Sequence, residues 1–149
     1  MFRTEPNASP LFSRNLRVLA RAQSGLVKRL ARPSDESHIV GDPLHLAVHR
    51  SRYPVALSAT DIDRAFDRVP VDAPVLMLFG VGLGELIRAA LKRHPSAKII
   101  AWDRDPAMIR RALERVDVAV AIQTGRLRFA MCADLLNHLP CESQHVVFH

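Results

Sequence analysis

The chain has 149 residues, of which 48% are apolar and 24% are charged. This length suits a single domain with a hydrophobic core of its own. No apolar run approaches the roughly 18 residues needed to cross a bilayer, and the first thirty residues hold no signal-peptide core, so we expect a globular, cytoplasmic protein.

The net charge of +6 belongs mainly to the first third of the chain. Residues 1–52 carry nine Arg or Lys against four Asp or Glu, whereas residues 53–149 carry twelve against eleven. An acidic partner, a nucleic acid or a membrane surface could use this bias, but one solvated helix face also produces it. Cys132 and Cys141 lack metal-like spacing, and we expect them to be reduced packing residues.

After a proline-containing arm at residues 1–10, the pattern becomes that of a basic amphipathic helix. One face carries the apolar residues Phe12, Leu16, Leu19, Leu26, Val27 and Leu30, and the opposite face carries Arg14, Arg17, Arg21, Lys28 and Arg32. Gly25 could interrupt this helix, and Arg32-Pro33 ends it. We expect the apolar face to dock on the protein and the basic face to meet solvent. Contact with a membrane or with phosphate groups is the main alternative, followed by an organelle presequence.

Two short apolar stretches then surround a Gly41-Asp42-Pro43 turn and predict a small hairpin. His45 and His49 lie within it, but no metal site is expected because the segment is not helical and has no HExxH glutamate. The following stretch "TDIDRAFDRV" predicts a short helix with Thr60 as its N-cap. We assign residues 1–72 to this N-terminal region of helix, hairpin and short helix.

From Val75 onward, strands and helices alternate as an α/β parallel sheet requires. We expect strands near residues 75–79, 98–103 and 127–132, helices near 84–93 and 106–116, and a fourth strand from His145. The predicted fold is a Rossmann-like α/β half-domain over residues 73–149. Doubly wound sheets usually have more strands, so we expect it to be truncated in strand four and prone to self-association.

Gly80, Gly82 and Gly84 follow the first of these strands and form the strongest motif in the sequence. A glycine-rich turn between a strand and a helix lets the backbone approach a phosphate or carboxylate closely. Asp103 follows the next strand at the spacing expected of an acid that binds ribose hydroxyls. These four residues are the candidate nucleotide site. A dinucleotide fingerprint would require glycine where this sequence has Glu85, and the glycines could instead serve only a tight turn.

The glycine spacing resembles motif I of class I S-adenosylmethionine methyltransferases. "AWDRDPAMIRRAL" is similar to their second motif, and "RLRFAMCADLLNHLP" to their third, with Asp134 at the place of the adenine-side acid. The family usually has an acid two residues before the first glycine, where this chain has Leu78. This resemblance makes a methyltransferase fragment that holds S-adenosylmethionine one alternative.

A longer stretch, most of residues 12–149, resembles the N-terminal region of the motility-accessory-factor (Maf) flagellin glycosyltransferases. "FGVGLG" is similar to that family's FGxGLG signature, with "FSRNLRVLARAQSGLVKRL" and "HIVGDPLHLAVH" before it and "KIIAWDRDPAMIRRALERVDV" and "GRLRFAMCAD" after it. Departures are Glu85 and Leu86, where an aromatic residue and His are common, and Asp103, where Glu is common.

The Maf resemblance implies a Rossmann-like accessory domain. It also implies nonulosonic sugar transfer to flagellin by a following domain, a nucleotide sugar as ligand, and flagellin or the remaining glycosyltransferase domains as partners. It supplies no catalytic residue for this chain. A non-enzymatic module that docks an acidic partner through its basic helix is the third reading, and nucleic acid is not the expected partner.

His94 and His138 follow apolar helical stretches and are expected at helix ends. Glu85 and Asp103 could also face each other as a pair of carboxylates with an acid–base role.

Overall fold

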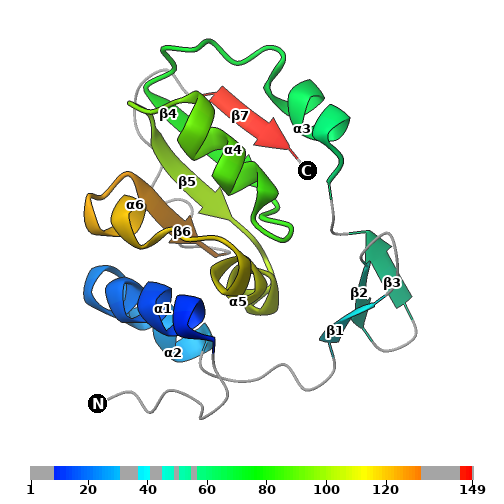
Figure 1. Ribbon diagram of the computed structural model, residues 1–149, viewed down its shortest axis with the longest axis vertical. Coiled ribbons are helices and arrows are strands. Elements are labelled where there is room, and N and C mark those ends of the chain that lie inside the picture. Colours follow the sequence, from blue (N-terminus) through cyan, green and yellow to red (C-terminus); the bar gives the residue numbers. More distant parts are fainter. Residues whose placement is uncertain are drawn as a thin grey trace.

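The computed structural model describes residues 9–30 and 57–131 in full and, for four further strands at 37–40, 45–48, 51–54 and 145–148, the backbone alone (Figure 1). Predictions for the arm at residues 1–8, Arg32-Pro33, Cys132, Asp134, His138 and Cys141 lie outside these residues.

The centre of the fold is a four-stranded parallel sheet with the strand order β6-β5-β4-β7. Its strands are β4 (Val75–Phe79), β5 (Lys98–Trp102), β6 (Leu127–Ala130) and β7 (His145–Phe148). Helix α4 (Glu85–Arg93) connects β4 to β5, and α5 (Pro106–Arg115) and α6 (Ala119–Gln123) lie between β5 and β6. The predicted Rossmann-like α/β fold is confirmed. In such a sheet the strand order reverses beside the first strand, and ligands bind at the carboxyl ends of the strands there.

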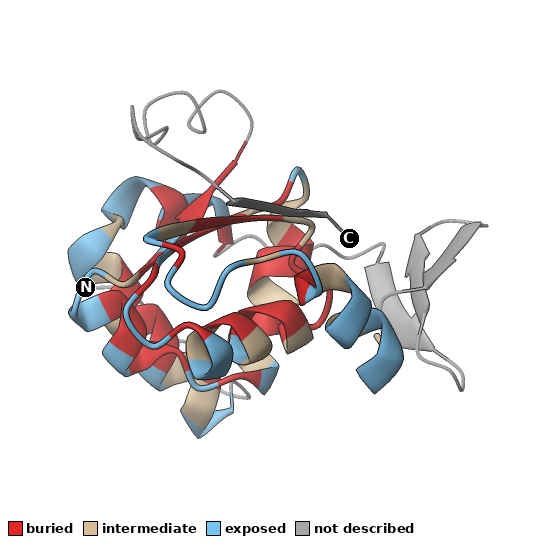
Figure 2. Ribbon diagram, turned by 90° about the horizontal axis from the view of Figure 1, so that it is seen from above, coloured by how far each residue is buried: buried red, intermediate tan, exposed pale blue. Residues whose placement is uncertain are grey.

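The strands bury their two faces in different ways, because alternate side chains point to opposite sides of a sheet. One face joins the helices in the main hydrophobic core and contributes Leu76, Leu78, Ile99, Ala101, Leu127 and Phe129. The other face holds a smaller cluster of Met77, Ile100 and Ala130, with Val75, Phe79 and Trp102 partly buried against it. Buried residues are accordingly concentrated where the helices meet the sheet (Figure 2).

The basic amphipathic segment forms two helices, α1 (Pro10–Ala22) and α2 (Ser24–Leu30). The break falls at Gln23, two residues before the expected Gly25. Helix α1 packs against α5 and α6, and α2 packs against α5 (Figure 1). Their apolar face belongs to the same core as the sheet, where Leu19, Val27 and Leu30 are fully buried, each stabilising the docked state by about 1.5–3 kcal/mol.

Two polar side chains fix these helices in place. Asn15 is fully buried and donates to the carbonyls of Leu113 and Val116, both at 2.8 Å, while its side-chain oxygen accepts from the amide of Val118 at 3.2 Å. Asn15 thereby pairs with backbone groups at the end of α5 that have no hydrogen-bond partner within the helix. Gln23 donates to the carbonyl of Phe129 at 2.7 Å and accepts from its amide at 2.9 Å. Its amide takes the place of a neighbouring strand along β6, which is an edge strand among the strands that the structure describes.

Helix α3 (Ala59–Phe66) begins one residue before the predicted Thr60 N-cap. The N-cap is Ser58, which accepts from the amide of Asp61 while the Asp61 carboxylate accepts from the amide of Ser58. This reciprocal capping box satisfies two backbone donors, so Thr60 lies inside the helix.

A separate antiparallel sheet has the strand order β1-β2-β3, with β1 (Ser37–Val40), β2 (His45–Val48) and β3 (Ser51–Pro54). The first two strands are the predicted hairpin, and the third strand was not predicted. Within the described ranges, no group of three or more His, Cys, Asp or Glu side chains could hold a metal ion. None of the helices in those ranges is long and apolar enough to cross a membrane.

Candidate functional site

The glycine turn lies at the carboxyl end of β4, where the fold places ligands. Gly80, Gly82 and Gly84 have φ angles of 85°, 53° and 95°, in the left-handed region that favours glycine. The amide of Gly80 donates to the carbonyl of Trp102 at the end of β5, at 2.9 Å. The turn is thus joined directly to the strand that precedes Asp103.

Gly84 has a second requirement besides its backbone angle. A Cβ atom at this position would lie 2.5 Å from Cγ2 of Val116 and 3.4 Å from Cβ of Ala112. Contacts between heavy atoms are most favourable near 3.5–4.0 Å, so any larger residue would push the start of α4 away from the end of α5. The third glycine therefore serves the packing of the two helices.

Asp103 is brought to the glycine turn, as its spacing predicted. It is 9% exposed, and its Oδ2 accepts from the amide of Val81 at 3.0 Å. Its Oδ1 accepts from the amide of Asp105, also at 3.0 Å, and Asp105 in turn caps α5 by accepting from Ala107 at 2.8 Å. Each oxygen of Asp103 therefore already holds one backbone donor. A carboxylate has about four acceptor positions, so ribose hydroxyls could still donate to the others.

Glu85 occupies the start of α4, where the helix dipole favours negative charge. Its Oε2 accepts from the amide of Leu83 at 3.1 Å, inside the glycine turn. Glu85 and Asp103 thus bind different amides of the same turn, those of Leu83 and Val81. Two of the donors that could have met a phosphate already hold carboxylates of the chain itself. The acid–base pairing of Glu85 with Asp103 stays a prediction.

Leu78, at the position where methyltransferases usually carry an acid, is fully buried in the main core. A carboxylate in that environment would lose its hydration without gaining a partner from the apolar residues around it. The leucine is therefore the residue that the packing of β4 requires.

A hollow of about 310 Å³ opens beside the glycine turn. It is lined by Leu83, Glu85, Arg88 and Arg115, and the Arg88 guanidinium donates to the carbonyl of Arg115 at 3.3 Å. Sequence reasoning did not single out these two arginines. Arg88 is three residues after Glu85 and so on the same side of α4, which is a signal, whereas the approach of Arg115 depends on how α5 packs.

His94 caps the end of α4, as expected of a polar residue after an apolar helix. It is only 3% exposed, its ring stacks on Phe66 with centroids 5.7 Å apart, and its Nδ1 lies 3.3 Å from the carbonyl of Val71. These contacts give His94 a structural role in packing at the end of α4.

Comparison with known proteins finds a likeness in structure. No family model and no curated protein sequence matches the chain. Among solved structures, it is similar to the structure of the Maf glycosyltransferase from Magnetospirillum magneticum AMB-1, with a TM-score of 0.60 and 16% sequence identity. The chain has a Maf-like fold. The likeness covers 81% of this chain and 27% of the Magnetospirillum protein, so the Maf-like region corresponds to about a quarter of that protein.

Proposed function

We propose that the chain is an N-terminal accessory domain, or a fragment, of a Maf-like glycosyltransferase that takes part in flagellin glycosylation. Its likeness to the Maf glycosyltransferase over 81% of its residues carries this proposal. Because the likeness covers 27% of that protein, the transfer of a nonulosonic sugar is assigned to other domains. Flagellin and those domains are the proposed partners, with self-association as the alternative.

The glycine turn is proposed as a weak site for a nucleotide or nucleotide sugar. Gly80, Gly82 and Gly84 carry no side chain at three positions of the turn, and Asp103 would accept hydrogen bonds from ribose hydroxyls through its remaining acceptor positions. Glu85 limits the affinity, because its carboxylate already accepts from the Leu83 amide, a donor that a phosphate would otherwise use.

Two alternatives were raised by the sequence. A methyltransferase would need a partner for the amino group of S-adenosylmethionine near residue 78, and the buried Leu78 offers none. An interaction module that docks an acidic partner through its basic helix would use Arg17, Arg21 and Lys28, which are exposed. The apolar face of the same helices is already buried in the core, so it is not available for insertion into a membrane.

The intact mass of flagellin tests the proposed function. Flagellin purified from a strain that lacks the gene should lose the mass of its sugar modifications, and a plasmid copy of the gene should restore it. A truncated copy that ends before Val75 should not restore it, because the sheet would be missing. Unchanged flagellin mass in the deletion strain would contradict the proposal.

A further inference from the structure

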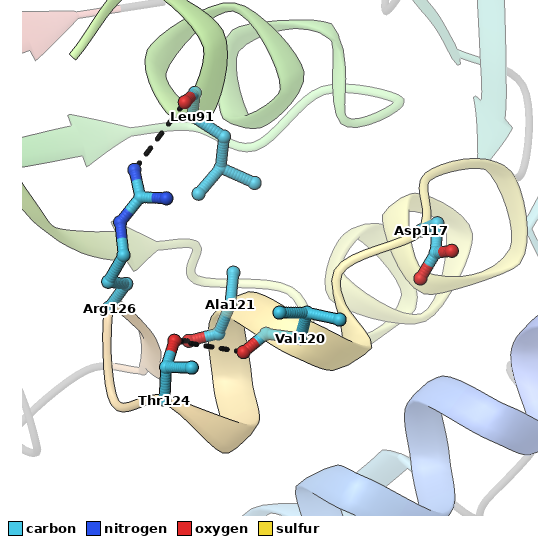
Figure 3. A pocket seen from close by; sticks show the side chains of 6 residues that line it. All are labelled: Leu91, Asp117, Val120, Ala121, Thr124 and Arg126. Carbon is cyan, nitrogen blue, oxygen red and sulfur yellow. Dashed lines mark hydrogen bonds between the residues drawn. The ribbon is translucent and has the colours of Figure 1, made fainter. Parts of the chain in front are cut away.

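Helix α4 runs beside the segment from Arg115 to Arg126, and two hollows open between them. The first is the hollow beside the glycine turn, to which α4 contributes Glu85 and Arg88. The second, of about 380 Å³, is lined by Leu91, Asp117, Val120, Ala121, Thr124 and Arg126 (Figure 3). Arg88 and Leu91 are three residues apart and therefore neighbours on the same side of α4. We call the two hollows together the α4 groove.

The second hollow is lined mainly by apolar groups. Leu91 projects from α4, and Val120 and Ala121 come from α6 (Figure 3). Val120 is 66% exposed, and Val71, 80% exposed, is the other large apolar side chain that the described residues leave in solvent. Among the described residues, Val120 is therefore the exposed large apolar side chain that lines this hollow, and an apolar group of a ligand would cover it there.

The charged groups that line the groove are three arginines and two carboxylates. Arg88 donates to the carbonyl of Arg115, and Arg126 donates to the carbonyls of Leu91 and His94 at 3.4 and 3.1 Å, so both bind neutral groups. In the described part of the chain, no carboxylate forms a salt bridge with Arg88, Arg115 or Arg126.

The two carboxylates of the groove have partners within the chain, one of them charged and one neutral. Asp117 forms a salt bridge with Arg14, and Glu85 accepts from the amide of Leu83. The groove thus combines three arginines that lack an acidic partner with an apolar lining. A ligand that brings its own carboxylates would complement them.

We propose that the α4 groove binds an acidic peptide segment of a partner protein. One apolar side chain of the segment enters the hollow beside Val120, and its carboxylates meet Arg88, Arg115 and Arg126. A helix or strand with this pattern is a common form of peptide recognition in grooves. A nucleic acid would leave Leu91 and Val120 without an apolar contact, and one exposed apolar side chain, Val120, is too small an area for insertion into a bilayer. This proposal does not depend on a role in flagellin glycosylation.

Fluorescence anisotropy on the full chain tests the proposal with three labelled peptides of about twelve residues, a length that spans one groove-bound helix. The first carries Leu at helical spacing with Glu elsewhere, the second replaces every Glu by Lys, and the third replaces every Leu by Ser. The Glu/Leu peptide should bind in the micromolar range at low salt and several-fold more weakly at high salt. The Glu/Ser peptide should bind at least about tenfold more weakly, and the Lys/Leu peptide should not bind.

Matched variants locate the binding. Val120→Ser and Arg88→Gln change exposed side chains and should each weaken the Glu/Leu peptide by about three- to tenfold without changing the thermal midpoint. Arg17→Gln with Lys28→Gln removes the same kind of charge from the basic helix and should leave binding unchanged. Amide NMR shifts should move at Leu91, Val120 and Thr124. The proposal is overturned if the Lys/Leu peptide binds equally well, if the basic-helix variant alone abolishes binding, if an RNA oligomer or anionic vesicle outcompetes the peptide, or if the Glu/Leu peptide does not bind.

Discussion

Replacing Asn15 with Ala should lower the free energy of unfolding by about 3 kcal/mol, although Ala is the better helix former. The Asn15 side chain is fully buried and makes three hydrogen bonds to backbone groups at the end of α5 and the segment after it. Each buried group left without its partner costs about 1–3 kcal/mol. The cost at each of the two carbonyls lies at the low end of that range, because each carbonyl has a second lone pair. The cost at the Val118 amide is higher. The helix propensity of Ala returns only about 0.5 kcal/mol.

Urea unfolding followed by circular dichroism measures this change as a shift of the midpoint at constant slope. Arg17→Gln is the matched control, since Arg17 lies on the same helix but is exposed, and it should change the unfolding free energy by no more than about 0.5 kcal/mol. Asn15→Asp keeps an acceptor for the Val118 amide but loses both donors and buries a charge, so it should be at least as damaging as Ala. An Asn15→Ala protein as stable as the Arg17→Gln control would refute the docking of α1 on α5.

Three further changes test the turn and the sheet edge. Gly84→Ala should destabilise the protein by about 2–4 kcal/mol, because the φ angle of 95° and the 2.5 Å approach of a Cβ atom to Val116 both oppose a side chain. Adding Val116→Ala should relieve part of this loss. If urea unfolding shows that the effects of the two substitutions are strictly additive, the clash is contradicted. Gln23→Leu leaves both backbone groups of Phe129 without their partner, so it should lower the free energy of unfolding by about 1–2 kcal/mol and promote association through the β6 edge. Sedimentation and unfolding experiments measure these effects. A monomer of unchanged stability would show that water replaces the Gln23 side chain. Asp103→Asn should cost about 1–3 kcal/mol, because one of its two acceptor oxygens becomes a donor facing an amide; an unchanged melting temperature would contradict the part played by Asp103 in holding the turn.

The sequence predicted the features that depend on local pattern. The alternation of apolar runs and helical periods located β4, β5, α4 and α5 to within about two residues, as expected for strongly periodic segments. The spacing from Gly84 to Asp103 correctly indicated that the acid meets the glycine turn, because two consecutive parallel strands end at the same edge of the sheet.

Features decided by tertiary contacts could not be predicted in the same way. Asn15 looks like an ordinary polar residue in a helix, and only the position of the end of α5 gives it three partners. The helix break at Gln23 depends on the β6 edge, which lies more than one hundred residues away in the chain. Helix α6 has only five residues, too few for a helical period to be recognised. The hydrogen bond from Leu83 to Glu85 was also missed, although both residues were visible in the motif.

The central claim is that the chain is a Maf-like domain in which Asp103 and Glu85 hold the amides of the glycine turn. Titration calorimetry of the chain with S-adenosylmethionine, NAD and a nucleotide sugar tests this claim most directly. Loss of the one charged contact that Leu78 cannot supply should weaken S-adenosylmethionine binding by about ten- to a hundredfold against a standard site. We therefore predict no detectable heat with S-adenosylmethionine or NAD at micromolar concentration, and at most weak binding of the nucleotide sugar that disappears in Asp103→Ala. Tight binding of S-adenosylmethionine that is lost in Asp103→Ala would contradict this account and establish the methyltransferase alternative.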